Sequence, residues 1–166
     1  MLFRSAAAGD NPTGTNIQGY VSNFRIVKGT ALYTSAFTPG TTPLQPITNT
    51  SMLTCQSPNF VDNSGNNYAL TINGTPKVQK YSPFNITTLP TPYYGAYFNG
   101  STDKLTLSSS SAMSLSGQFT VECWVYWAGT STSYQNFVGS NDTFTNNASF
   151  FRVWGSAAGG TLGEIG

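Results

Sequence analysis

Acid–base chemistry in this chain would depend on carboxylates, because the sequence contains no histidine. The carboxylates are Asp10, Asp62, Asp103, Glu122, Asp142 and Glu164. Glycoside hydrolysis needs two facing carboxyl groups about 5 Å apart or somewhat further, and Glu122 in "FTVECWVY" has no carboxylate two or four residues further along. The lack of histidine also excludes Ser-His-Asp triads, Cys-His pairs and histidine-ligated metal sites within the chain. We therefore expect no enzymatic activity, and a hydrogen-bonding structural role for Glu122.

Two turn sequences supply oxygen ligands that suit a calcium ion. Asp62 begins "DNSGNN" and Asp103 ends "NGSTD", and their carboxylate, amide and hydroxyl oxygens have the hardness that Ca²⁺ prefers. Neither segment matches an EF-hand loop, and each brings a single carboxylate. Asp62 and Asp103 are therefore the candidate calcium ligands, with a role in the turns alone as the alternative. No other cofactor is expected.

The segment "QFTVECWVYW" is the strongest strand pattern in the chain. Because side chains alternate between the two faces of a strand, one face would carry the predicted core residues Phe119, Val121, Cys123, Val125 and Trp127. The other face would carry Thr120, Glu122, Trp124 and Tyr126. This second set combines flat aromatic rings with hydrogen-bonding groups, which suits stacking on sugar rings. The candidate glycan-binding residues are therefore Trp124, Tyr126 and Glu122. The alternative is that both rings pack beneath a covering loop, since large aromatic side chains are mostly buried.

The composition indicates an uncharged all-β protein. Charged residues make up 8% of the 166 residues, against about 25% in an average soluble protein, whereas aromatic residues reach 14%. The basic residues are scattered and the net charge is +1, so neither nucleic acid nor an anionic membrane is an expected partner. No stretch approaches the roughly 20 apolar residues of a membrane helix, and "MLFRSAAAGD" lacks the apolar segment of a signal peptide.

The two cysteines, Cys55 and Cys123, are too far apart in sequence to form a CxxC pair. Each lies in a strand-like run, which favours a role as a small buried hydrophobic residue. The alternative is a disulfide between them, which would require an oxidising compartment.

Strands and turns alternate along the whole chain. Helical periodicity does not persist, and β-branched and aromatic residues recur between clusters of Gly, Pro and Asn. We expect strands at 20–27, from 52, around 68–72, within "YYGAYFNGSTDKLTL", in "QFTVECWVYW" and in "FFRVWGS". Turns are expected at "DNSGNN", Asn73-Gly74 and Asn99-Gly100.

Three segments together resemble laminin-G-like, concanavalin A-like jelly-roll domains. "YFNGSTDKLTLSSSSAMSLSGQFTVECWVYW" resembles the hairpin and the "FTxExWV" strand of that family, and "MLTCQSPNFVDNSGNNYALTINGTPKV" resembles its first strand and turn. "GYVSNFRIVKGTALYTSAFTPGTTPL" resembles its closing strand and exit. The resemblance implies an all-β, two-sheet antiparallel jelly-roll sandwich, either permuted or incomplete. Residues 1–45 would be closing strands, 46–50 a linker and 51–166 the opening and central strands, in one domain or in two.

Domains of this kind occur in fibre and virion surface proteins of tailed bacteriophages, marine ones especially. The resemblance thus implies a non-enzymatic structural or adhesion module of a virion, extracellular, with other virion proteins, copies of itself and host-surface glycans as partners. The missing signal peptide agrees with this, because virions assemble in the cytoplasm and leave by lysis. The alternative is a secreted bacterial adhesin or carbohydrate-binding repeat protein. A relative of the jelly-roll glycoside hydrolases ranks third, because the paired carboxylates are missing.

The strand at 20–28 sets one further expectation. It is too apolar to remain solvated, and an unpaired edge would invite aggregation. We expect Tyr20, Phe24 and Ile26 on one face, and we expect residues 20–28 to be hydrogen-bonded in a sheet that also contains residues from 51–166. The rival hypothesis is that this strand closes a preceding domain and shares no ladder with the rest.

Overall fold

A computed structural model describes residues 2–3, 15–84, 93–108, 113–115, 117–128, 134–139 and 149–154. The strands are β1 (Leu2–Phe3), β2 (Thr15–Asn16), β3 (Gln18–Lys28), β4 (Thr50–Thr54), β5 (Leu70–Asn73), β6 (Lys77–Gln79), β7 (Gly95–Asn99), β8 (Lys104–Leu107), β9 (Phe119–Trp127), β10 (Tyr134–Gly139) and β11 (Ser149–Trp154). Among the described residues no α-helix forms, and hence none that is long and apolar enough to cross a membrane. The all-β prediction is confirmed.

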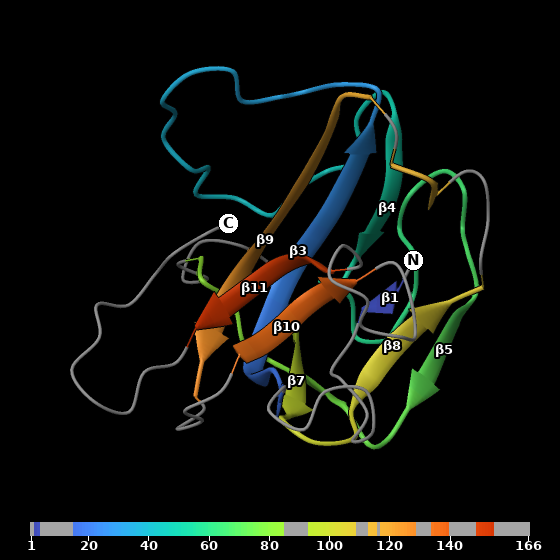
Figure 1. Ribbon diagram of the computed structural model, residues 1–166, viewed down its shortest axis with the longest axis vertical. Coiled ribbons are helices and arrows are strands. Elements are labelled where there is room, and N and C mark those ends of the chain that lie inside the picture. Colours follow the sequence, from blue (N-terminus) through green and yellow to red (C-terminus); the bar gives the residue numbers. More distant parts are fainter. Residues whose placement is uncertain are drawn as a thin grey trace.

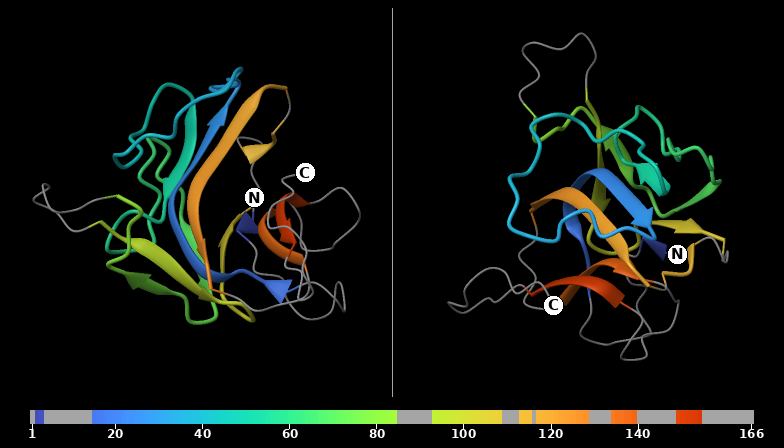
Figure 2. Two further views of the ribbon diagram at one scale, coloured as in Figure 1. Left: turned by 90° about the vertical axis from the view of Figure 1, so that its left-hand side faces the viewer. Right: turned by 90° about the horizontal axis from the view of Figure 1, so that it is seen from above.

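The strands form two curled sheets (Figure 1). Sheet A has the order β11-β10-β1-β8-β5, with β2 pairing parallel to β10. Sheet B has the order β4-β3-β7-β6, with β9 pairing to β3. Its ladders are antiparallel. Seen from above, β3 and β9 lie in one layer and β10 and β11 in another (Figure 2). The arrangement is consistent with a β-sandwich.

Buried side chains from both sheets meet in one hydrophobic core. It contains Val21, Phe24, Ile26, Met52, Ala96 and Phe98 from sheet B and Leu105, Leu107 and Val138 from sheet A. The two-residue period is clearest in β8, where the buried Leu105 and Leu107 alternate with half-buried polar residues. Because one face of each strand is used for this core, the opposite face of sheet B, called the outer face below, is left for other contacts.

The strand β3 is the centre of sheet B. It pairs with β9 from Gly19 to Lys28. Since that ladder occupies one edge, the other edge is shared by β7, which pairs with 18–21, and β4, which pairs with 24–27. The prediction that residues 20–28 are hydrogen-bonded in a sheet with residues from 51–166 is therefore confirmed, within this chain.

A β-bulge at Asn23 divides β3 into two parts. Its register against β9 shifts between Ser22 and Arg25, and Asn23 has a φ of 54°, a left-handed conformation that Asn tolerates better than most residues. The extra residue reverses which side chains face the core. Phe24 and Ile26 are core residues, whereas Tyr20 lies among tyrosines on the outer face. The expectation that Tyr20 shares a face with Phe24 and Ile26 was wrong for this reason.

The predicted alternation of β9 holds, but its burial is incomplete. Val121 and Cys123 pack against the core, whereas Val125 is 37% and Phe119 36% exposed. Trp127 is half-buried. In the part of the chain that the structure describes, β9 pairs with β3 alone, so its side chains have a strand beside them on one side only. The prediction that Val125 and Phe119 are core residues was wrong.

Both cysteines are free thiols in the structure. Cys55 directly follows β4 and accepts a hydrogen bond from the Asn23 N–H of β3, while Cys123 lies in β9 on the far side of β3. Two strand spacings separate β4 from β9 by about 10 Å, more than the roughly 7 Å that a disulfide allows between Cα atoms. Burial raises the pKa of each thiol from 9.0 to about 12. Both side chains therefore serve as neutral packing groups.

Candidate functional site

Four tyrosines form a cluster on the outer face of sheet B. Tyr20 in β3 lies directly opposite Tyr126 of β9 on one side and Tyr97 of β7 on the other, and antiparallel partners project from the same face. Tyr81, just beyond β6, stacks on the Tyr20 ring. These residues, Tyr20, Tyr81, Tyr97 and Tyr126, are called the tyrosine cluster below. Three sequence-distant segments thus bring their rings together around β3.

The rings of the tyrosine cluster are in mutual contact. The centroid of Tyr20 lies 4.4 Å from that of Tyr81, 5.1 Å from that of Tyr97 and 6.1 Å from that of Tyr126. Tyr81 and Tyr126 are 5.6 Å apart. These distances lie in, or at the short edge of, the favourable range of about 4.5–7 Å for aromatic pairs. The cluster is therefore a preorganised surface.

Exposure differs sharply within the cluster. Tyr126 is 54% exposed, whereas the other three rings are half-buried. Desolvation, followed by the neighbouring phenols of Tyr126 and Tyr20, raises the pKa of Tyr81. Its hydroxyl therefore remains protonated well above neutral pH and can both donate and accept a hydrogen bond. The cluster offers flat apolar surface together with neutral polar groups.

A close glycine contact allows β9 to lie in this position. A Cβ atom at Gly19 would lie 2.2 Å from the carbonyl oxygen of Tyr126, and Gly19 has a φ of 150°. Any other residue would push β9 away from β3 at the level of the tyrosine cluster.

Trp124 adjoins the tyrosine cluster but is more enclosed than Tyr126. Its ring meets that of Phe84 edge to face at 5.0 Å, and Phe84 in turn contacts Tyr93. Phe84 is buried and Trp124 is half-buried. Of the two predicted glycan-stacking aromatics, Tyr126 thus presents the larger free surface, and Trp124 supports the segment around Phe84.

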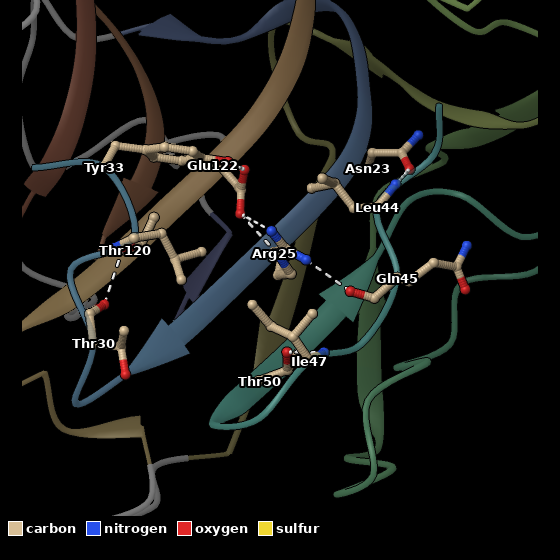
Figure 3. A network of polar contacts seen from close by, with 11 residues as sticks. Asn23, Arg25, Thr30, Tyr33, Leu44, Gln45, Ile47, Thr50, Thr120 and Glu122 are labelled. Atoms are coloured by element: carbon tan, nitrogen blue, oxygen red, sulfur yellow. Dashed lines mark hydrogen bonds and ion pairs between the residues drawn. The ribbon is translucent and has the colours of Figure 1, made fainter. Parts of the chain in front are cut away.

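Glu122, the third predicted binding residue, lies in a polar network further along β9 (Figure 3). Its Oε1 accepts hydrogen bonds from Arg25 Nε at 2.7 Å and Nη2 at 2.6 Å, and its Oε2 accepts one from the Tyr33 hydroxyl at 2.6 Å. The side chains of Arg25 and Glu122 are only 7% and 13% exposed. Desolvation and the hydrogen bond to Glu122 raise the pKa of Tyr33. Both carboxylate oxygens are thus already engaged by side chains of the protein.

The loop 29–49 covers this part of the outer face. Arg25 Nη1 donates to the carbonyl of Gln45 at 2.7 Å, and the Leu44 N–H donates to Asn23 Oδ1 at 2.9 Å (Figure 3). At the other end of the loop, Thr120 Oγ1 accepts from the Leu32 N–H and donates to a loop carbonyl. We call the region around Arg25, Glu122 and Thr120 the covered half of the face, and the region of the tyrosine cluster the open half.

The two candidate calcium ligands are anchors of two separate turns. Asp62 is buried and accepts hydrogen bonds from the N–H groups of Leu53, Ser64 and Tyr68 and from the Ser64 hydroxyl. Asp103 is also buried and accepts from the N–H groups of Thr75 and Asn99. Among the described residues no group of three or more His, Cys, Asp or Glu side chains could hold a metal ion. These hydrogen bonds give both carboxylates a structural role in the turns. The calcium hypothesis remains a prediction.

Sequence reasoning located Tyr126 but missed the partners that surround it. Tyr20, Tyr81 and Tyr97 come from three other segments, which are brought together by the register of β3 against β7 and β9 and by the pairing of β6 with β7. The two-residue alternation in "GAYFN", with Ala96 and Phe98 buried and Tyr97 on the other face, is the sequence signal that could have located Tyr97. The carboxylates Asp10, Asp142 and Glu164 lie outside the described residues.

A scan against protein-family models found no match, and searches of curated proteins and of solved structures found no significantly similar chain.

Proposed function

We propose that this chain is a non-enzymatic β-sandwich module of jelly-roll type that mediates adhesion by binding glycans on its tyrosine cluster. The observation that carries the proposal is the half-exposed ring of Tyr126, held against Tyr20 and Tyr81 on an otherwise preorganised aromatic surface. The apolar C–H face of a sugar ring packs on such a surface, and phenol hydroxyls and sugar hydroxyls are complementary hydrogen-bonding groups. Because the rings already contact one another, little side-chain entropy is lost on binding.

The non-enzymatic part of the proposal is supported by the state of Glu122. A glycosidase carboxylate must reach the sugar as an acid, base or nucleophile. Both oxygens of Glu122 are instead held by Arg25 and Tyr33 beneath the loop 29–49. We assign this carboxylate to the stability of the covered half.

The biological setting of the proposal comes from the resemblance of three segments to jelly-roll domains of tailed-bacteriophage fibres and virion surfaces. An adhesion module of a virion would meet host-surface glycans through the open half. A secreted bacterial adhesin is the alternative setting, and the same surface would serve it.

The experiment is a glycan array probed with the wild-type protein, Tyr126→Ala and Phe37→Ala. Phe37 is a matched control because it is an aromatic side chain with the same 54% exposure, stacked on Tyr33 in the loop 29–49. We expect the wild type to bind at least one class of oligosaccharide and Phe37→Ala to bind normally. Tyr126→Ala should lose about fivefold or more in affinity, as removal of an aromatic stacking contact of about 1–3 kcal/mol implies. A folded wild-type protein that binds no oligosaccharide, or equal losses in both variants, would overturn the proposal.

A further inference from the structure

The open half includes a lysine in line with the tyrosines. Lys77 of β6 lies directly opposite Tyr97 of β7, and antiparallel partners project from the same face with Cβ atoms about 5 Å apart. Tyr97 lies opposite Tyr20, and Tyr20 lies opposite Tyr126. The four side chains therefore form a single cross-strand row, Tyr126–Tyr20–Tyr97–Lys77, over the adjacent strands β9, β3, β7 and β6.

The row is long enough for more than one sugar ring. Three strand spacings amount to about 14 Å. The exposed ring of Tyr126 stands at one end and the exposed side chain of Lys77 at the other. A ligand that follows the row would stack on the exposed Tyr126 ring at one end, pass over the half-buried Tyr20 and Tyr97, and meet an ammonium group at the other end.

The charge of Lys77 has no counterpart in the part of the chain that the structure describes. Asp62 accepts hydrogen bonds from the backbone N–H groups of Leu53, Ser64 and Tyr68, and Asp103 accepts them from those of Thr75 and Asn99. Glu122 is paired with Arg25. These three are the carboxylates of the described residues. The row thus ends in a cation that the described carboxylates do not neutralise.

We propose that this row binds an acidic oligosaccharide of at least two sugar rings, with its carboxylate or sulfate group at Lys77. The proposal rests on the proposed glycan-binding function and adds the charge class of the ligand and its direction along the sheet. An ammonium group that donates to an anionic oxygen makes a charge-assisted hydrogen bond, which is about twice as strong as a neutral one. A neutral sugar in the same place would leave the ammonium group without this contact.

The test is an array of matched oligosaccharide pairs. Trisaccharides of galacturonic acid and of glucuronic acid are printed beside their neutral methyl esters, and a sulfated galactan trisaccharide is printed beside its desulfated form. The wild type, Lys77→Gln, Lys104→Gln and Tyr126→Ala are compared. Lys104→Gln removes the same charge from β8 in sheet A and is the matched control, and circular dichroism verifies that each variant is folded.

We expect the wild type to bind an acidic member about threefold to fivefold more tightly than its neutral partner, as an ion pair at an exposed lysine implies. Lys77→Gln should remove this preference, and Lys104→Gln should retain it. The carboxylate and sulfate arms then identify which anion is preferred. Equal binding of acidic and neutral members, still lost in Tyr126→Ala, would overturn the acidic ligand but leave the glycan-binding function intact. An equal loss of preference in both lysine variants would overturn the role of Lys77, and no binding at all would overturn both proposals.

Discussion

The covered and open halves lie on the same outer face of sheet B and are built on the same two strands, but the chemistry of their surfaces differs. In the covered half, β3 and β9 contribute Arg25 and Glu122, and the loop 29–49 is tethered over their ion pair. In the open half, the same strands contribute Tyr20 and Tyr126, and the ring of Tyr126 remains exposed. The boundary between them is the bulge at Asn23.

The two halves differ because their side chains differ in how many hydrogen-bonding partners they require. An ion pair at a nearly buried position needs further hydrogen-bonding partners, because desolvated charges are costly unless all their groups are paired. The loop supplies those partners through the Gln45 carbonyl and the Tyr33 hydroxyl. The tyrosine cluster has no such requirement, because aromatic rings stabilise one another in partial contact with water. Asn23 contributes to the boundary in two ways. Its left-handed backbone forms the bulge in β3, and its side chain accepts a hydrogen bond from the Leu44 N–H of the loop.

The largest expected effect on stability comes from breaking the covered half. Arg25→Ala would leave the Glu122 carboxylate nearly buried without its cation, and removal of one partner of such a pair costs about 3 kcal/mol or more. Chemical denaturation should show this loss, and Lys77→Ala, which removes an exposed charge, should change stability by less than about 0.5 kcal/mol. The double variant Arg25→Ala/Glu122→Ala should regain part of the loss. If Arg25→Ala unfolds at the wild-type denaturant concentration, the ion pair does not hold the covered half together.

The next largest effect on stability arises from the two thiols in the core beneath sheet B and appears as a dependence of stability on pH. Burial raises the pKa of the Cys55 and Cys123 thiols from 9.0 to about 12. Below pH 9 both thiols are protonated in the folded and unfolded states, so they add no pH dependence. Between pH 9 and 12 only the unfolded state releases these protons, so stability falls as the pH rises, by an amount on the order of 1–2 kcal/mol per thiol at about pH 10.

This alkaline loss is measured by thermal unfolding across that pH range. The variant Cys55→Ala/Cys123→Ala is the control: it should be less stable at neutral pH but should lose less stability as the pH rises. Identical slopes in the two proteins would show that other groups, such as the tyrosines, cause the alkaline loss.

A smaller effect is expected from Glu122→Gln. The amide keeps the size of the side chain but loses the charge that both guanidinium contacts use, and hydrogen bonds to charged groups contribute about 1.5–3 kcal/mol. We expect a loss of about 2 kcal/mol in denaturant unfolding and unchanged binding in the open half. A variant that loses glycan binding while its stability is unchanged would assign Glu122 to the binding surface and remove the contrast between the halves.

The smallest effect on stability is expected from Tyr126→Ala. Its ring is 54% exposed, and substitutions at exposed positions usually change stability by about 0.5 kcal/mol or less, to which lost ring contacts add somewhat. We expect a change below about 1 kcal/mol by the same denaturation assay, together with the loss of glycan binding. A loss as large as that of Arg25→Ala would mean that the tyrosine cluster is a structural element of the fold.

The strands of this fold could largely be predicted from sequence, because their two-residue periodicity is local. The alternation in "QFTVECWVYW" placed Val121 against the core and Tyr126 on the opposite face. The bulge at Asn23 could not be predicted in this way, because one extra residue within an apolar strand leaves no mark on its composition. It reversed the orientation of Tyr20, on which the whole tyrosine cluster depends.

The candidate site was predicted only in part, because it is assembled by register. The row Tyr126–Tyr20–Tyr97–Lys77 is joined by three cross-strand pairs between segments that are distant in sequence. The partner of Glu122 is distant as well, since Arg25 lies in β3. No local pattern in the sequence specifies these pairs.

Binding at the open half is tested most directly by an NMR titration of isotopically labelled protein with the oligosaccharide that binds most strongly on the array. The backbone amide signals of Tyr20, Tyr97 and Tyr126 are compared with those of Tyr33 and Phe37 in the loop 29–49. We predict saturable shifts at the first three residues and no change in the loop. Shifts centred on Tyr33 and Phe37, or an array without any bound oligosaccharide, would contradict the assignment of binding to the open half.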